Sequence, residues 1–341
     1  MTGVHDVLLL DLDGVVYVGP HPVAHAADRI AAARRGGLRV AFVTNNASRA
    51  PADVAAQLRD LGVSAQAADV VTSAQAGAAV VAGLVTSGGA VLVVGAPALQ
   101  DAVTDRGLRP VATAAHRPAA VIQGFGPDVG WRLLAEGAYA LADPGVVWVA
   151  TNTDLTIPTP GGIAPGNGSL VAVLATVTGR TPVVAGKPEP ALLIEAVNRT
   201  AAAQPLVVGD RLDTDILGAV RAGLPSLLVL TGVTTVPALL AAGPQQRPTY
   251  LAADLRGLDA AQPAATVLTD DRSVCGTASA AMAGDRVEVT VADGGGDGLD
   301  GLRAVAALTW ARTDLGLPTD VTGLNVAALV PPNESGTAAE R

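Results

Sequence analysis

The sequence predicts an α/β fold built on a parallel sheet, and two observations carry this expectation. Short, continuous apolar runs recur along the chain, and Ala-rich segments with helical spacing separate them. Apolar strands that alternate with helices in this way are typical of a parallel sheet covered by helices on both faces. Ligands of such sheets bind outside the carboxyl ends of the strands, so the residues that follow each strand are the first candidates for function.

The strand candidates are the apolar runs at residues 7–10, 40–43, 90–94, 121–123, 146–150, 182–185, 206–208 and 226–230. Helical spacing predicts helices over residues 24–35, 51–61, 97–105, 130–141, 168–177, 190–200 and 214–222. Residues 70–100 contain no charged side chain, but polar residues and glycines interrupt them, whereas a membrane span needs roughly 20 strongly apolar residues. We therefore expect a helix of small residues, a turn at Gly88-Gly89 and the strand 90–94 in this stretch.

The composition and pattern of the sequence change from about Leu258. Residues 260–265 resemble a linker, 286–291 an edge strand, and 293–300 a turn before a helix at 301–314. We expect residues 266–330 to form a small, separate α+β unit, and the polar residues 331–341 to form a disordered tail.

Composition limits the classes of function. A chain of 341 residues with 50% hydrophobic residues is long enough for two or three domains, and its net charge of −9 argues against a nucleic-acid surface. Cys275 is the only cysteine, which excludes an internal disulfide and a cysteine-rich metal site. A single cysteine fits a reducing cytoplasm, which is the expected location, and the N-terminus lacks the pattern of a signal peptide.

Two aspartates follow the first strand candidate, in Asp11-Leu12-Asp13-Gly14. At such a position one carboxylate can attack an electrophile while the other transfers a proton. Two acids this close repel each other unless a cation shares the site. The same residues also fit the opening of a loop, because Asp and Gly are common in turns.

Polar residues also follow the strand candidate at 40–43. Thr44, Asn45 and Asn46 offer a hydroxyl, two amides and main-chain N–H groups that can hold phosphate oxygens. A cap for the following helix is the competing interpretation, because Thr and Asn are preferred at helix N-termini.

Acids gather after the strand candidate at 206–208, where Asp210, Asp213 and Asp215 follow one another closely. Three carboxylates at a strand end can bind a hard divalent cation through oxygen. A capping loop, with Asp215 in the first turn of the helix, explains them equally well.

Lys187, in Gly186-Lys187-Pro188, is the only lysine among 22 basic residues. Arginine carries a planar fork, whereas lysine carries a compact ammonium on a flexible stem. A site that needs a point charge in a tight space would keep its lysine, and chance retention is the alternative.

Together these segments occur in the order Asp-x-Asp, Thr, Lys and Gly-Asp-x4-Asp, which resembles the haloacid dehalogenase-type phosphatases. The strings DLDGVVYVG at 11–19, VTNNAS at 43–48, GKP at 186–188 and VGDRLDTDI at 208–216 are similar to the class IIA branch. That branch includes p-nitrophenyl, pyridoxal, phosphoglycolate and glycerol phosphate phosphatases. The resemblance covers about residues 5–255.

The resemblance implies a Rossmann-like parallel-sheet core of the haloacid dehalogenase type, into which an α/β cap domain is inserted. About 140 residues separate the Thr44 and Lys187 segments, far more than a connection needs. The implied core covers residues 1–81 and 183–257, and the implied cap covers 82–182. The small C-terminal α+β module, 266–330, resembles the acetyltransferase-like module of actinobacterial glycerol-3-phosphate phosphatases.

The family also implies roles for individual residues. Asp11 attacks phosphorus and forms an aspartyl-phosphate, while Asp13 protonates the leaving group and then activates water. Mg²⁺ is expected on Asp11, on the main-chain carbonyl of Asp13 and on Asp210, with Asp215 orienting the water ligands of the metal. Lys187 is expected to neutralise charge on the nucleophile and the phosphoryl group.

Substrate contacts are implied for Thr44, Asn45, Asn46 and Lys187, and for three residues at the return of the cap, Asn152, Asp154 and Ile157. Asp154 fits a structural cap as well as a substrate contact.

The function that follows is a Mg²⁺-dependent phosphomonoesterase for a small phosphorylated metabolite, with glycerol 3-phosphate as the leading candidate. An uncharged Ile157 fits a small polyol phosphate somewhat better than an aromatic cofactor. Phosphoglycolate, pyridoxal phosphate or a nucleotide are the alternative substrates, and a non-enzymatic sensor of phosphorylated metabolites is the alternative of another class. No nucleic-acid partner and no membrane span are expected, and the family suggests a homo-oligomer formed through the cap.

Overall fold

The computed structural model describes residues 3–159, 161–260, 262–292 and 297–331. The chain divides into two compact units: the first holds Met1–Val40, Leu61–Ser64 and Ala202–Arg341, and the second holds Ala41–Asp60 and Ala65–Ala201. The second unit thus combines the predicted cap, 82–182, with segments of the predicted core. The boundaries of the cap at 82 and 182 stay a prediction.

A parallel sheet lies at the centre of the first unit. Its strands there are, in order, β15 (Tyr250–Ala252), β14 (Ser226–Val229), β13 (Pro205–Gly209) and β1 (Val7–Leu10), and all neighbours run parallel. Every residue of β1, β13 and β14 is buried, as their mainly apolar sequence predicts for a sheet covered on both faces, and Ser226 of β14 is the polar exception.

Short elements complete this part of the first unit. The helices are α1 (Ala26–Arg35), α8 (Leu217–Ala222) and α9 (Val236–Leu240), and the strands β2 (Tyr17–Val18) and β3 (His21–Pro22) form a small hairpin. A π-helical turn, η3 (Leu212–Ile216), precedes α8, and 3-10 turns cover η4 (Pro244–Gln246) and η5 (Leu255–Leu258). The predicted helix at 214–222 therefore begins as a π-helical turn.

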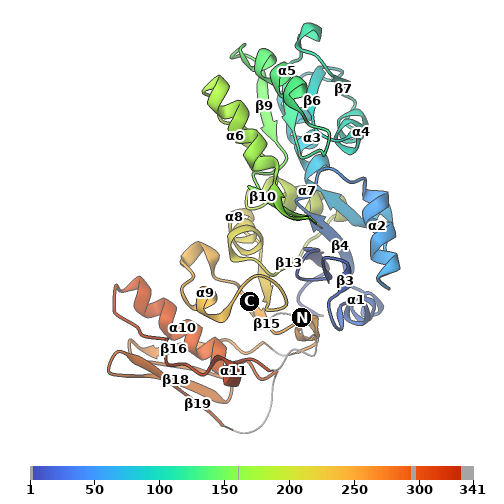
Figure 1. The fold of residues 1–341 in the computed structure, drawn as a ribbon. Coiled ribbons are helices and arrows are strands. Elements are labelled where there is room, and N and C mark those ends of the chain that lie inside the picture. The colour runs from blue at the N-terminus through green and yellow to red at the C-terminus, as the bar shows by residue number, and fades with distance from the viewer. Residues whose placement is uncertain (1–2, 160, 261, 293–296, 332–341) are drawn as a thin grey trace. The chain divides into compact units, whose positions relative to one another are not determined.

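The C-terminal part of the first unit is a four-stranded antiparallel sheet covered by a helix (Figure 1). The strands are, in order, β16 (Thr266–Thr269), β17 (Arg272–Cys275), β18 (Ala278–Ala283) and β19 (Arg286–Val291), and the helices are α10 (Asp300–Asp314) and α11 (Val326–Leu329). β19 and α10 confirm the predicted strand and helix.

A single apolar core joins this C-terminal part to the parallel sheet of the same unit. Leu302 and Val305 of α10 belong to one buried cluster with Leu228 of β14 and Leu251 of β15. That residues 266–330 form a separate module stays a prediction, and residues 332–341 of the predicted tail lie outside the described residues.

A second parallel sheet, of five strands, lies in the second unit. Its strands are, in order, β12 (Val183–Val184), β9 (Val147–Ala150), β8 (Ala120–Gln123), β6 (Ala90–Val94) and β7 (Arg109–Val111). The two sheets confirm the predicted α/β class. The short strand β7 is absent from the prediction because its sequence, Arg-Pro-Val, is no apolar run.

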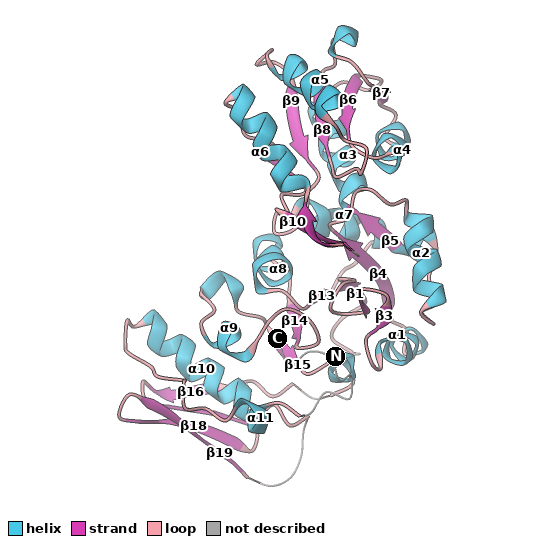
Figure 2. Ribbon diagram, in the orientation of Figure 1, coloured by secondary structure: helices cyan, strands magenta, loops and turns pink. Residues whose placement is uncertain are grey.

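Helices cover both faces of this five-stranded sheet (Figure 2). Helix α3 (Ser73–Leu84) lies on one face beside α4 (Pro97–Asp105), where a Cβ on Gly77 would stand 3.2 Å from Cδ1 of Ile122. On the other face, α5 (Trp131–Leu141) and α6 (Asn167–Thr178) share a buried cluster with β6 and β8.

In the uncharged stretch 70–100, helix α3, a turn at Gly88-Gly89 and strand β6 confirm the expected elements, whereas the short strand β5 (Val70–Thr72) at its start was not predicted. Thr72 and Gln75 start α3 as a reciprocal cap, in which each side chain accepts a hydrogen bond from the main chain of the other. Among the described residues, no helix is both long enough and apolar enough to cross a membrane.

The second unit also holds further strands, helices and 3-10 turns. Strand β4 (Arg39–Thr44), which begins in the first unit, pairs in parallel with β5. Strands β10 (Thr156–Thr159) and β11 (Gly162–Pro165) form an antiparallel hairpin. The helices are α2 (Pro51–Asp60) and α7 (Ala191–Thr200), with 3-10 turns η1 (Ala67–Asp69) and η2 (Ala114–His116).

Candidate active site

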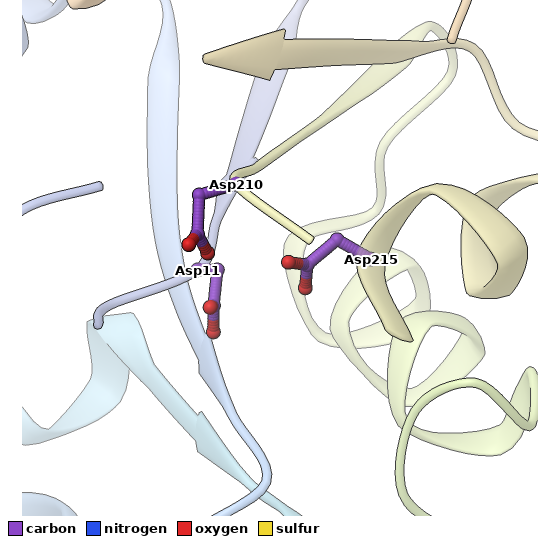
Figure 3. A group of neighbouring side chains, drawn as sticks. All are labelled: Asp11, Asp210 and Asp215. Carbon is purple, nitrogen blue, oxygen red and sulfur yellow. The ribbon is translucent and has the colours of Figure 1, made fainter. Parts of the chain in front are cut away.

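Three aspartates of the first unit bring their carboxylates together. Asp11, Asp210 and Asp215 each offer one oxygen, and these oxygens lie within 4.8 Å of one another (Figure 3). Asp11 directly follows β1, and Asp210 directly follows β13, which pairs with β1 in parallel. Because neighbouring parallel strands end at the same edge of a sheet, the two aspartates are delivered to one place.

The local structure holds two of these carboxylates firmly. Asp210 is 1% exposed, and its Oδ2 accepts a hydrogen bond of 2.6 Å from the N–H of Val233. Asp215 is 0% exposed and lies in the η3 turn, where its Oδ2 accepts a hydrogen bond of 3.1 Å from the N–H of Arg211. Buried carboxylates that crowd one another need a compensating cation. A ligand set made only of oxygens fits Mg²⁺ or Ca²⁺.

Glycines make room for this carboxylate cluster. A Cβ on Gly14, whose φ is +77°, would stand 2.4 Å from Cγ of Asp210, and one on Gly232 would stand 2.0 Å from its Oδ2. A Cβ on Gly209 would stand 2.2 Å from Cβ of Asp215. Side chains at these positions would collide with the acids.

Sequence reasoning missed the loop after β14. Thr231 donates a hydrogen bond from its hydroxyl to the carbonyl of Gly14, and Gly232 and Val233 line Asp210. The available signal was the Thr-Gly pair directly after a buried strand, at the same edge of the sheet as Asp11 and Asp210.

Two other aspartates singled out in the sequence lie outside the carboxylate cluster. Asp13 is exposed in the turn after β1, and its predicted metal contact, through the main-chain carbonyl, stays a prediction. Asp213 forms an ion pair with Arg211, with an Nη2–Oδ2 distance of 2.7 Å. The hydrogen bond from Arg211 holds the pKa of Asp213 below its usual range.

The second unit brings together the Thr44 and Lys187 segments. Thr44 ends β4 and is 7% exposed, while Lys187 is 3% exposed and donates a hydrogen bond of 3.4 Å from Nζ to the carbonyl of Val43. The carboxamide of Asn45 pairs with the main chain of Lys187: Oδ1 accepts from its N–H at 2.8 Å, and Nδ2 donates to its carbonyl at 2.9 Å. The roles predicted for Thr44 and Lys187 stay predictions.

Asn46 organises the loop that follows β4. Its Oδ1 accepts hydrogen bonds from the N–H of Ser48 at 2.9 Å and of Arg49 at 3.1 Å, and its own N–H donates to Oγ1 of Thr44. Ser48 and Arg49 precede α2, which begins at Pro51, so the side chain orders the loop ahead of the helix rather than the first turn of the helix itself. The substrate contact expected of Asn46 stays a prediction.

The residues expected at the return of the cap lie beside Asn45. Asn152 donates from Nδ2 to the carbonyl of Asn45 at 2.7 Å, and Nδ2 of Asn45 lies 3.3 Å from Oδ2 of Asp154. Ile157 lies on strand β10, where it pairs with Ala164 of β11. Ser73, which the sequence did not single out, also donates its hydroxyl hydrogen to the carbonyl of Asn45.

The parallel sheets and the carboxylates at the strand ends define a class of hydrolase, and comparison with known proteins agrees. A profile of haloacid dehalogenase-like hydrolases matches residues 8–109, and a related HAD-hydrolase-like profile matches residues 184–258. The chain belongs to this family, as the sequence motifs predict.

Individual relatives cover most of the chain. It is 47% identical to a D-glycerol 3-phosphate phosphatase of Mycobacterium tuberculosis, over 90% of this chain and 86% of the relative. A crystal structure of a glycerol phosphate phosphatase from M. tuberculosis in complex with magnesium is 46% identical, with a TM-score of 0.80 and coverage of 91% of each chain. A p-nitrophenyl phosphatase from Archaeoglobus fulgidus is 26% identical, with a TM-score of 0.68, over 74% of this chain and 98% of its own.

Proposed function

We propose that this chain is a Mg²⁺-dependent phosphomonoesterase that hydrolyses glycerol 3-phosphate. The observation that carries the proposal is the cluster formed by Asp11, Asp210 and Asp215 at the strand ends of a haloacid dehalogenase-like hydrolase. Its oxygen atoms suit a hard divalent cation, and Asp11 occupies the position that the family uses for its nucleophile. When bound, Mg²⁺ supplies the positive charge that offsets repulsion between carboxylates and a phosphate.

Asp11 and Asp13 perform the bond changes in this proposal. An oxygen of Asp11 forms a bond to phosphorus while the bond from phosphorus to the alcohol oxygen breaks, which leaves the phosphoryl group on Asp11. Asp13 donates a proton to the departing oxygen and then accepts one from the water that attacks phosphorus. Phosphate leaves, and the Asp11 carboxylate is restored. Asp13 is exposed in its turn, so both the alcohol and water can reach it.

Lys187 and Thr44 supply charge and hydrogen bonds to the phosphoryl group in the same proposal. The Lys187 ammonium is almost fully buried, and a buried ammonium is strongly attracted to an anion. Thr44, at the end of β4, contributes its hydroxyl, and Asn45 contributes its main-chain N–H. Phosphoryl transfer depends mainly on such positioning and electrostatic stabilisation.

The choice of glycerol 3-phosphate rests on the extent of the resemblance. The M. tuberculosis D-glycerol 3-phosphate phosphatase matches 90% of this chain, so the match extends into the C-terminal part. The 5′-nucleotidase of Bacillus subtilis and the acid sugar phosphatases of Staphylococcus aureus match only 66% and 67% of it. The uncharged Ile157 on the β10–β11 hairpin fits a small polyol.

The arrangement of domains belongs to the same proposal. Residues 82–182 act as a cap that excludes water and contacts the leaving group through Asn152, Asp154 and Ile157. Residues 266–330 serve a packing or regulatory role, and copies of the chain associate through the cap. The single cysteine and a metabolite substrate fit a cytoplasmic enzyme.

A panel of phosphomonoesters tests the proposal. We expect kcat/KM to be highest for glycerol 3-phosphate among substrates that include phosphoglycolate, pyridoxal phosphate and a nucleoside monophosphate, and we expect EDTA to abolish turnover. Asp11→Asn should lower kcat by roughly 10³-fold or more, because the nucleophile is lost. Asp213→Asn is the matched control, since Asp213 lies outside the carboxylate cluster, and it should retain activity.

The outcomes separate the alternatives. A clear preference for another phosphomonoester would replace the substrate and leave the phosphatase. Equal inertness of the wild type and Asp11→Asn, with every metal and substrate, would instead favour a protein that only binds phosphorylated metabolites.

A further inference from the structure

Asn45 forms hydrogen bonds beyond those that a residue holding phosphate oxygens would require. Its carboxamide forms two hydrogen bonds with the main chain of Lys187, one to the N–H and one to the carbonyl. Two hydrogen bonds to one residue fix both its position and its rotation. The pairing also fixes the orientation of the amide, because a flipped Asn45 would set two N–H donors against each other.

The same residue is tied to the segment 151–154, which follows strand β9 and is here named the return segment. Nδ2 of Asn45 lies 3.3 and 3.4 Å from the two carboxylate oxygens of Asp154. The carbonyl of Asn45 accepts hydrogen bonds from Nδ2 of Asn152 at 2.7 Å and from the hydroxyl of Ser73. Asn45 therefore connects Lys187 to the return segment through both its side chain and its main chain.

The return segment is itself held tightly on two sides. Asn167, at the start of α6, donates from Nδ2 to the carbonyl of Asn152 at 2.7 Å. A Cβ on Gly186 would stand 2.5 Å from the carbonyl oxygen of Thr151, and one on Gly168 would stand 2.2 Å from that of Thr153. Main chain packs against main chain at both places, so a displacement of the return segment is passed to Gly186 and its neighbour Lys187.

The position of the Lys187 ammonium depends strongly on its main chain. Nζ stands at the end of a stem of four carbons, so a rotation of the main chain displaces it, and burial of the side chain leaves the stem little freedom to compensate. The ammonium is buried, with Nζ 3.4 Å from the carbonyl of Val43, and a buried charge is strongly destabilised when it is misplaced. The chain keeps no other lysine that could replace it.

We propose that Asn45 is a positioning residue that links the return segment to Lys187, so that the placement of the catalytic ammonium depends on the segment through which the cap rejoins the core. The assignment of Lys187 as catalytic rests on the proposed function, but the link itself is a property of the fold. Asn45 does not need to touch the substrate with its side chain to fulfil this role.

The single lysine allows a direct test. Labelling the protein with [15N]lysine gives one main-chain amide signal, that of Lys187. Because this N–H is bonded to Oδ1 of Asn45, we expect slow exchange with solvent, and we expect Asn45→Ala to shift the signal and accelerate exchange at least tenfold. Asn152→Ala should also shift the Lys187 signal, because its effect reaches Lys187 through Asn45, whose carbonyl accepts a hydrogen bond from Asn152. Asn198→Ala, an exposed asparagine on α7, is the control and should leave the signal unchanged.

A mutant cycle provides the functional readout. Asn45→Ala should lower kcat by about tenfold or more in the wild type, and by much less in Lys187→Ala, because its effect passes through the lysine. If Asn45→Ala lowers kcat by the same factor with and without Lys187, Asn45 acts independently of the lysine, and the proposal is overturned. An unmoved amide signal in Asn45→Ala would overturn it too, and an unmoved signal in Asn152→Ala would remove the return segment from it. The NMR result does not depend on activity, so it stands even if the chain proves not to be a phosphatase.

Discussion

The Asp210 carboxylate occupies a space that only glycine neighbours leave open. Gly232 has an ordinary φ, so its role is purely to provide room: an added Cβ would stand 2.0 Å from Oδ2 of Asp210. Such a distance is far inside van der Waals contact, so the carboxylate or the loop would have to move.

Gly232→Ala should therefore damage the carboxylate cluster specifically. We expect an overpacking cost of about 1–3 kcal/mol in the free energy of unfolding, together with a large loss of Mg²⁺ affinity. Gly243→Ala is the matched control, because nothing lies within 4 Å of its added Cβ. Thermal melting and Mg²⁺ titration measure the two effects. Equal behaviour of the two variants would show that Asp210 is not confined in this way.

At the residue scale, sequence pattern located the acids but not their surroundings. Asp11 and Asp210 could be predicted because each directly follows an apolar run that pattern identifies as a strand. Gly232 and the two-point pairing of Asn45 with Lys187 could not, because both depend on which loops the fold brings into contact. The sequence left two interpretations open for Asn46, a phosphate contact and a helix cap, and the structure shows its side chain ordering the loop after β4.

At the scale of elements, Asp6 joins the start of β1 to the start of β13. Its carboxylate accepts hydrogen bonds from the N–H of Ala203 at 2.9 Å and of Gln204 at 2.8 Å, and it forms an ion pair with Arg39. The N–H of Ala203 is the main cause that holds the pKa of Asp6 below its usual range.

Asp6→Asn should destabilise the protein by about 1 kcal/mol at pH 7, after allowance for the partial exposure of the carboxylate. The lowered pKa means that the folded state favours the ionised form. The contribution is thus fully present above the pKa of the unfolded chain, near 4, and is lost as pH falls through the lower folded value. Urea unfolding of the wild type and the variant from pH 7 to pH 2.5 measures it. The exposed Asp101→Asn is the control, and a difference between wild type and Asp6→Asn that persists at pH 2.5 would contradict the account.

Elements were predictable where burial was two-sided. The runs at 7–10 and 90–94 coincide with β1 and β6, because strands covered on both faces need unbroken apolar sequence. Strands β10 and β11, which are rich in Thr, Pro and Gly, were not predicted, and neither was β18, whose residues are nearly all Ala or Ser. Pattern cannot detect strands whose side chains are small or whose faces are exposed.

At the scale of the whole molecule, the reactivity of the single cysteine tests whether the C-terminal sheet unfolds together with the rest of the protein. Cys275 lies in β17, is buried, and donates its S–H to the carbonyl of Pro263 at 3.3 Å. Burial raises the pKa of this thiol to about 11, and the charge of Asp300 adds to the effect. The thiolate is the reactive form, so the folded protein should protect Cys275.

We expect Cys275 to react with a disulfide reagent at pH 8 roughly 100-fold more slowly than an exposed thiol. The variant Cys275→Ser with Thr277→Cys provides the control, because Thr277 is exposed in the turn between β17 and β18. In increasing urea, reactivity should appear together with the loss of circular dichroism, because α10 shares one core with β14 and β15. Reactivity that appears at clearly lower urea would show that residues 266–330 unfold as a unit of their own.

The overall architecture could be predicted only in part from sequence. The alternation of apolar runs with helical segments predicted the α/β class, and the short motifs predicted the family, because both depend on residues that are close together in the chain. The shared core of the C-terminal sheet and the parallel sheet could not be predicted, since it brings together residues such as Leu302 and Leu251, which are far apart in the chain.

Titration of the protein with Mg²⁺ by calorimetry, compared with Asp210→Asn, tests most directly whether the carboxylates of Asp11, Asp210 and Asp215 form the cation site on which the proposed hydrolysis depends. We predict one Mg²⁺ bound per chain of the wild type and an affinity at least 100-fold weaker in Asp210→Asn, because a buried ligand of the cation is lost. Equal Mg²⁺ affinity in the two proteins, with Asp210→Asn correctly folded, would contradict the account.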